Sequence, residues 1–267
     1  MKHNESYISI QQQMFLKREQ QKKRTISFFR FILILTFLFL WEIAARSGWI
    51  DSFFFSSPSR VCACFLFSLR ENHLVMHVAI SLLETLISFL LIMLFSLLTA
   101  SLLWRFGIVS KILEPMLVLL NSLPKSALAP LIIVWLGTGL RTIVVCGISV
   151  AIFGCIINLY TGFQSADPEK QKLITILGGE KRHIFTMVIL PSNIETIVSN
   201  MKVNIGLALV GVMIGEFLAA KRGLGYLIIY SSQVFELDLL IMCIVILCII
   251  AVLLYQAIHL IEKKICR

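Results

Sequence analysis

Residues 173–191 read LITILGGEKRHIFTMVILP, a polar stretch broken by glycines that lies between long apolar segments. Its first part carries apolar residues at helical spacing on one face, namely Leu173, Ile174, Ile176 and Leu177. The pattern predicts a short amphipathic helix that breaks at Gly178-Gly179 and a second helix that begins near Glu180 and runs into Pro191. An apolar face outside the membrane must cover something. It lies either on lipid headgroups or against another protein.

Six segments around this stretch are long and apolar enough to cross a hydrocarbon core of about 30 Å. The chain has 267 residues, 58% hydrophobic and 15% charged, too few charges to cover a soluble domain of this size. Backbone in lipid must bond internally, and the length of these runs suits helices rather than barrel strands. The sequence therefore predicts an all-α polytopic membrane protein with about six transmembrane helices: Ser27–Ala45, His77–Trp104, Leu113–Leu136, Thr142–Phe163, Ile194–Phe217 and Leu239–Ile261.

The placement of Lys and Arg predicts the orientation of these spans. With six spans, four basic regions fall on one side: the N-terminal tail, the second connection, the fourth connection and the C-terminus. We expect both termini in the cytoplasm, a basic tail over residues 1–26, a single transmembrane domain over 27–267 and a cytoplasmic loop at about 164–191. The net charge of +9 comes from such clusters. Because they flank apolar runs, they indicate contact with anionic membrane lipid and not with nucleic acid.

The third span is irregular. It carries Pro115, Pro124 and Pro130, each of which removes a backbone donor and clashes with the preceding turn. Irregular backbone at membrane depth is tolerated where it is buried in protein or lines a watery cavity. The functional interpretation is a pathway-lining segment, and the alternative is a kinked helix whose lysine reaches an interface. The pathway-lining candidates here are Asn121, Pro124, Lys125, Ser126 and Pro130.

Polar residues also occur in the fifth span. Asn200, Lys202 and Asn204 form a cluster that lipid disfavours, and they complete the set of pathway-lining candidates. Glu195 and Glu216 stand near the two ends of this span and are interpreted as interfacial.

Small residues at intervals of four follow in the same span, at Gly211, Gly215 and Ala219. That spacing lets two helices approach closely, either within one subunit or between two. We therefore interpret these three residues as a helix-packing surface.

No pattern in the chain resembles an active site. There is no GxxxxGK[ST] loop for nucleotide phosphates, no HExxH and no GxSxG. The seven cysteines form no framework, and His73 and His77, four residues apart, have no third ligand nearby for a metal. We therefore predict a chain that is not an enzyme and that binds no metal or cofactor.

Three motifs, in order, carry a family resemblance. Gly178, nine further residues and then VILP at 188–191 resemble the cytoplasmic "EAA" loop of binding-protein-dependent ABC transporter permeases. LPKSALAPL at 123–131 with WLGTG at 135–139, and GEFLAA at 215–220 with GLGY at 223–226, are similar to the nitrate/sulfonate/taurine branch. One departure is that Lys172-Leu173-Ile174 stands where the Glu-Ala-Ala of the loop would be.

The resemblance implies a type I ABC importer permease fold in a prokaryotic cytoplasmic (inner) membrane. It implies an ABC ATPase dimer that holds ATP and Mg, a second permease that is either an identical copy in a homodimer or a different permease, and an extracytoplasmic solute-binding protein. The ATPase-docking residues that it assigns are Leu173, Ile174, Leu177, Gly178, Gly179 and Glu180.

The predicted function is to form the pathway for a small solute. A nitrate-, sulfonate- or taurine-like anion is one possibility, since Lys125 or Lys202 could attract it. A neutral pyrimidine- or riboflavin-like vitamin precursor is the alternative within the same class. An ATP-independent channel or secondary carrier is an alternative of another class, although the sequence shows no repeat symmetry. A membrane-embedded enzyme is disfavoured because no acid, base and nucleophile converge.

Overall fold

The computed structural model describes residues 10–70 and 73–265, and all its regular elements in these ranges are helical. In chain order they are α1 (Ile10–Arg46), α2 (Ser52–Phe55), α3 (Pro58–Arg70), α4 (His73–Arg105), α5 (Gly107–Ser122), α6 (Lys125–Leu136), α7 (Leu140–Gln164), α8 (Pro168–Ile176), α9 (Lys181–Ile184), a π-helix (Phe185–Ile189), α10 (Leu190–Ser192), α11 (Ile194–Ala219), α12 (Leu224–Gln233) and α13 (Leu237–Ile265). The predicted all-α fold is confirmed.

The chain divides into two compact units, Met1–Ala63 and Cys64–Arg267. In the first unit, α1 runs without a break past residue 26, where the sequence placed the end of a basic tail. The turn after α1 is held by the carboxylate of Glu42, which accepts hydrogen bonds from the N and Oγ atoms of Ser59 at 3.1 and 2.9 Å. The single transmembrane domain over 27–267 stays a prediction.

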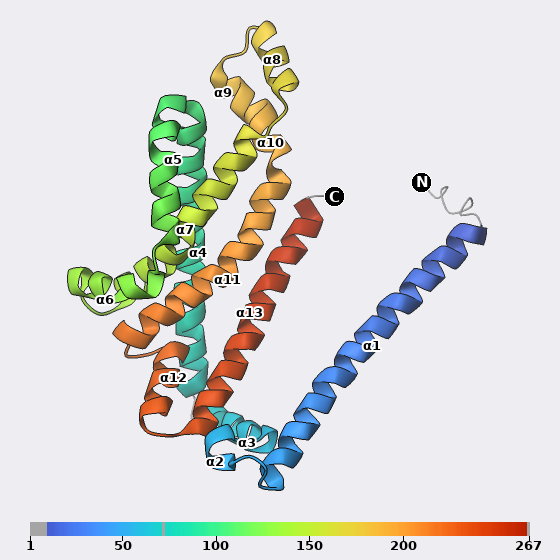
Figure 1. The fold of residues 1–267 in the computed structure, drawn as a ribbon, viewed down its shortest axis with the longest axis vertical. Helices are drawn as coiled ribbons and strands as arrows, with labels where there is room; N and C mark the ends of the chain where they lie inside the picture. The colour runs from blue at the N-terminus through green and yellow to red at the C-terminus, as the bar shows by residue number, and fades with distance from the viewer. Residues whose placement is uncertain (1–9, 71–72, 266–267) are drawn as a thin grey trace. The chain divides into compact units, whose positions relative to one another are not determined.

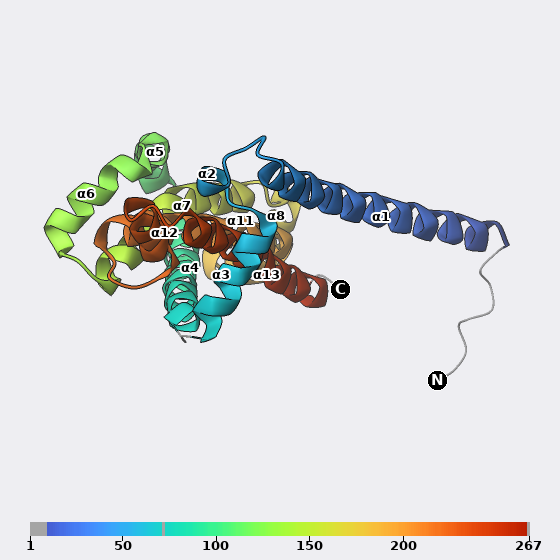
Figure 2. The ribbon, with the colours of Figure 1, turned by 90° about the horizontal axis from the view of Figure 1, so that it is seen from below.

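Five segments of the described chain are long and apolar enough to cross a membrane: Arg24–Arg46, Leu74–Arg105, Leu140–Gln164, Ile194–Ala219 and Leu237–Lys264. Helices α5 and α6 pass the same test together, although they are bent by 96° relative to one another. Figures 1 and 2 show α6 running across the direction of α5. The five helices and the bent pair agree with the predicted six spans.

The bend of the third span differs from the sequence expectation. Pro115 and Pro130 lie inside α5 and α6, and the helix breaks only at Leu123-Pro124. Pro124 caps α6 with a φ of −67°, the value that a proline ring imposes. Lys125 satisfies the end of α5, because its Nζ atom donates to the carbonyl oxygens of Leu120 and Asn121, each at 2.6 Å. A sharp break is tolerated here because the freed carbonyl groups keep a donor.

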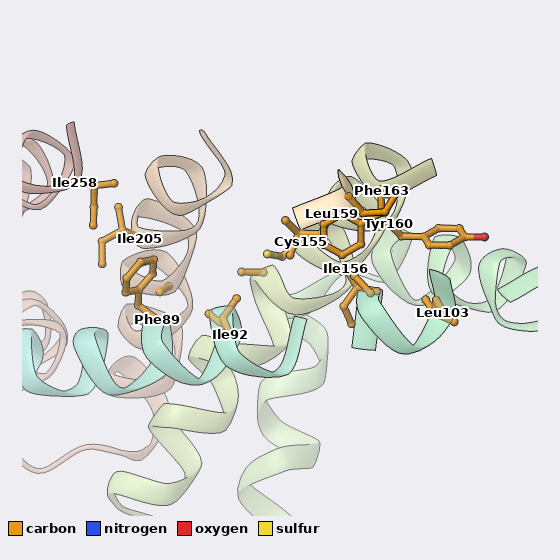
Figure 3. Close-up of a cluster of buried hydrophobic side chains, with 14 of the residues drawn as sticks. Phe89, Ile92, Leu103, Cys155, Ile156, Leu159, Tyr160, Phe163, Ile205 and Ile258 are labelled. Carbon is orange, nitrogen blue, oxygen red and sulfur yellow. The ribbon is translucent and has the colours of Figure 1, made fainter. Parts of the chain in front are cut away.

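The core of the second unit lies between α4, α7 and α11. Figure 3 shows side chains from all three helices meeting in one cluster. Ile92 of α4 and Leu159 and Phe163 of α7 are fully buried, and Ile205 of α11 is 2% exposed. This core positions the two long helices on either side of the 164–191 loop.

Helices α7 and α11 approach each other closely at their small residues. A Cβ atom added to Gly211 would lie 2.8 Å from the Cα of Gly147, and one added to Gly215 would lie 2.9 Å from the Cα of Ile143. Both neighbours are backbone atoms, which cannot rotate away. The surface formed by Gly211, Gly215 and Ala219 therefore packs against α7 of the same chain, at Gly211 and Gly215.

Replacing Gly211 with Ala should destabilise the protein by about 1–3 kcal/mol, because the added methyl group overpacks a backbone contact. The matched control is Gly206→Ala on the same helix, where an added Cβ meets nothing within 4 Å. That change should be neutral or should stabilise by up to about 1 kcal/mol, the helix propensity difference. Thermal unfolding of both purified variants in detergent measures the difference. Equal melting temperatures would contradict the close packing.

Candidate functional site: the loop between α7 and α11 and the adjoining groove

The loop begins with a capped helix. Asp167 is the N-cap of α8, and its carboxylate accepts a hydrogen bond from the backbone N of Glu169 at 2.9 Å, while Pro168 takes the first helical position. The helix ends where Gly178 adopts a φ of +83°, a conformation that favours glycine. The backbone N of Gly179 then donates to the carbonyl oxygen of Ile174 at 2.9 Å.

A second helical segment follows the double glycine directly. Glu180 caps α9, and its backbone N donates to Nδ1 of His183 at 3.2 Å. The chain continues through the π-helix and α10 to Asn193 without leaving helical geometry. The predicted order of a helix, a break at the glycines and a second helix near Glu180 is confirmed.

The apolar face of α8 is uncovered. Leu173 is 55% exposed, and Ile176 and Leu177 are each 74% exposed. Ile174 is half-buried because its side chain folds back over Gly179, where an added Cβ would lie 2.5 Å from Ile174 Cγ2. The residues assigned to ATPase docking thus form one protruding knuckle at the end of α7 and α11 (Figure 1).

Aromatic packing joins this knuckle to the core. The ring of Phe185, in the π-helix, lies 5.4 Å from that of Trp104 on α4 and 5.5 Å from that of Phe163 on α7. Phe163 is fully buried. Nζ of Lys181 also donates to the carbonyl oxygen of Arg105 at 3.5 Å. A displacement of the loop would therefore shift side chains that pack on α4 and α7, and it would move the start of α11, which continues from the loop.

A polar groove lies between α7 and α11 on the loop side of the bundle, with a volume of about 580 Å³. Amide and hydroxyl side chains line it, together with Glu195 and the apolar Val203. Asn158 Nδ2 donates to Asn200 Oδ1 across the groove at 3.3 Å. The hydroxyl and amide groups are those of Asn158, Thr161, Ser165, Thr196, Ser199 and Asn200.

The predicted pathway-lining residues do not gather in one place. Asn200 lines the groove, whereas Asn204 is buried and donates to the carbonyl oxygen of Asn200 at 2.8 Å. Lys202 points elsewhere and forms an ion pair with Glu262 of α13 at 2.5 Å. The candidates around the bend of the third span are not among the groove's lining residues: Asn121 lies in α5, Pro124 caps α6, and Lys125, Ser126 and Pro130 lie in α6.

Sequence reasoning missed most of the groove. Positions 158, 161 and 162 on α7, with its C-cap residue 165, and positions 196, 199, 200 and 203 on α11 follow the spacing of one helical face. That spacing is legible in the sequence, because both stripes interrupt otherwise apolar runs. What the sequence did not reveal is that α7 and α11 lie side by side, so that the two stripes meet.

The interfacial interpretation of Glu216 is wrong. Glu195 is exposed at the loop end of α11, but Glu216 is only 1% exposed. Its carboxylate accepts a hydrogen bond from Ser81 Oγ at 2.6 Å and one from the backbone N of Gly225 at 2.6 Å. Burial is possible because these donors replace water.

The comparisons with known proteins agree with this arrangement of helices. Residues 92–267 match the family described as "Binding-protein-dependent transport system inner membrane component". The chain is similar to a solved structure titled "Crystal structure of an amino acid ABC transporter with histidines", with a TM-score of 0.61, 15% identity, and coverage of 75% of this chain and 98% of the other. At that identity the likeness concerns the fold.

Curated relatives are more similar in sequence. The "Probable ABC transporter permease protein" of Haemophilus influenzae is 28% identical over 85% of this chain and 92% of its own length. The formylaminopyrimidine transport permease protein ThiX of Halalkalibacterium halodurans is 26% identical over 79% and 82%. The taurine transport system permease protein TauC of Escherichia coli is 26% identical over 57% and 56%.

The chain therefore belongs to the family of binding-protein-dependent transport system inner membrane components. It is an integral inner-membrane permease subunit of the ABC importer class. Permeases of this class have no catalytic activity of their own, and the family implies an ATPase and a substrate-binding protein as partners.

Proposed function

We propose that the knuckle formed by α8, Gly178, Gly179 and α9 is the surface through which a partner ATPase drives this permease. The observation that carries the proposal is the exposure of Leu173, Ile176 and Leu177 at the junction of the two groove-lining helices. Three large apolar side chains on a polar loop fit an apolar groove on a protein, and the double glycine gives the knuckle its sharp end. Glu180 adds a polar edge to the same surface.

The knuckle is connected to both groove-lining helices, α7 and α11, so a movement of the knuckle can change the groove. Phe185 packs on Phe163 of α7, and the π-helix that holds Phe185 runs through α10 directly into α11. ATP and Mg, bound by the partner, supply the energy that favours one loop position over another. Two conformers that differ in the spacing of α7 and α11 would then open the groove alternately to the two sides. A second copy of the chain, in a homodimer, completes the pathway opposite the groove.

The solute that suits this groove is small, uncharged and rich in hydrogen-bonding groups. Its lining offers amides and hydroxyls, and its one charged lining residue, Glu195, disfavours anions. The two lysines that could attract an anion are occupied, Lys125 by backbone carbonyl groups and Lys202 by Glu262. A formylaminopyrimidine, which the ThiX relative is named for, has this chemistry. A taurine-like zwitterion or sulfonate is the second candidate, because TauC is also similar to this chain.

Placing charge on the knuckle should uncouple the permease. The double change Leu173→Asp and Leu177→Asp should reduce the amount of co-purified ATPase at least tenfold, since two carboxylates would have to be desolvated in an apolar contact. The matched control is Thr175→Asp, because Thr175 is exposed and lies on the opposite face of α8. Both variants should insert normally in the membrane. ATPase retention and ATP-driven uptake at wild-type levels in the double variant would contradict the knuckle as the coupling surface, whereas uptake that needs no ATP would favour an ATP-independent carrier.

Removing one hydroxyl from the groove should weaken transport. In proteoliposomes with the ATPase and binding protein, Ser199→Ala should lower formylaminopyrimidine uptake about fivefold, the effect of one net hydrogen bond of about 1 kcal/mol. Ser232→Ala on α12, which is exposed and bonds only its own helix, should have no effect. ATP-driven uptake of taurine but not of the pyrimidine would contradict the neutral solute while leaving the importer function intact.

A further inference from the structure

A pair of buried carboxyl groups lies at the end of the bundle opposite α8 and α9, where α12 joins α11 (Figure 1). Glu216 of α11 is 1% exposed and Glu84 of α4 is 4% exposed. Both residues lie within segments long and apolar enough to span a membrane. The solute groove and the knuckle use neither residue, so their role is independent of the function proposed above.

Glu216 is surrounded by hydrogen-bond donors. Its carboxylate accepts from Ser81 Oγ and from the backbone N of Gly225, each at 2.6 Å. Ser81 Oγ in turn accepts from the backbone N of Leu224 at 2.8 Å. Glu216 and Ser81 together therefore satisfy the first amide groups of α12, where a negative charge is favoured. A proton on Glu84 would add a further donor to this carboxylate.

Close approach of the backbone makes this capping possible. A Cβ atom on Gly223 would overlap the Glu216 carboxylate, and one on Gly225 would lie 2.7 Å from Glu216 Cβ. Gly223 also has a φ of +120°, and its backbone N donates to His77 Nδ1 at 2.9 Å. The Gly-Leu-Gly sequence thus lets α12 begin directly on a buried carboxylate.

Glu84 has the opposite surroundings. Its carboxyl group lies one helical turn from Ser81, on the face of α4 that contacts Glu216, and its Oε2 atom is buried with no hydrogen-bond partner among the described residues. Two carboxylates have only acceptor atoms, so a hydrogen bond between them requires a proton on one of the two. Because Glu216 already receives donors from Ser81 and α12, the proton belongs on Glu84. An ionised Glu84 would leave a buried charge without a donor, which is strongly unfavourable.

Neighbouring groups offer no compensating cation. Within residues 10–70 and 73–265, neither carboxyl group forms an ion pair with Lys, Arg or His. Lys125 on α6 is held by carbonyl groups and Arg141 on α7 is exposed. The ionisable side chains at this end include His77 on α4, Cys146 and Arg141 on α7, Tyr226 and Tyr230 on α12, and Asp238 on α13. The two cations in the connection from α11 to α12, Lys221 and Arg222, are exposed.

We infer that Glu84 and Glu216 form a buried proton-binding site, in which a protonated Glu84 donates to an ionised Glu216. The bound proton helps to hold α4, α11 and the start of α12 together. Ser81 and Glu216, which join α4 to α11 at this site, are 135 positions apart in the sequence. The site carries one negative charge in place of two.

The two glutamates should respond differently to the same substitution. Glu84→Gln keeps a donor toward Glu216 and should leave the melting temperature of the full-length protein in detergent within about 2 °C of wild type. Glu216→Gln places an amide NH₂ group among donors and should lower it by several times that amount. Glu114→Gln, an exposed glutamate on α5, is the matched control and should change nothing.

Infrared difference spectra on hydrogen–deuterium exchange report the proton itself. The carbonyl band of a protonated carboxyl group should be present in wild type and in Glu114→Gln and absent in Glu84→Gln. The wild-type melting temperature should also fall as the pH rises and the proton is released, while Glu84→Gln should lose this dependence, because the folded state binds the proton. A Glu84→Gln spectrum that retains the band, or equal destabilisation by both glutamate variants, would overturn the inference.

Discussion

At Gly147, Gly211 and Gly215 the backbones of α7 and α11 approach so closely that no further side chain atom fits between them. Lipid offers little hydrophobic drive for helix association, so close backbone contact and buried hydrogen bonds must hold these helices. The contact places two polar stripes side by side as the groove and leaves the intervening loop as a protruding knuckle. Both candidate sites depend on this one helix pair.

The two ends of that pair are built differently. At the loop end, Phe185 packs on Trp104 and Phe163, and exposed leucines lie beyond them. At the other end, Glu216 and Ser81 join α11 and α4 to α12 by buried hydrogen bonds. Apolar packing lets a loop shift with modest loss, whereas buried polar bonds are costly to break. This difference suits a helix pair that is driven at one end and anchored at the other.

Much of the fold was legible in the sequence, because the length of each apolar run and the positions of the glycines fix where helices begin and end. The knuckle followed from Gly178-Gly179 and the apolar spacing before them. The sequence could not show that Lys202 meets Glu262 or that Glu216 meets Glu84, since each pair joins residues far apart in the chain. The sequence also suggested that all three prolines interrupt the third span. Only Pro124 stands at the break, while Pro115 and Pro130 lie inside helices.

Transport by this permease, as proposed here, requires that the knuckle be a cytoplasmic surface covered by an ATPase. A cysteine placed at Leu177, in a background without exposed cysteines, tests it with a membrane-impermeant maleimide. We expect labelling in inside-out vesicles that hold the permease alone, protection once the ATPase is bound, and no labelling from the external side. Labelling from outside, or labelling that the bound ATPase leaves unchanged, would contradict it.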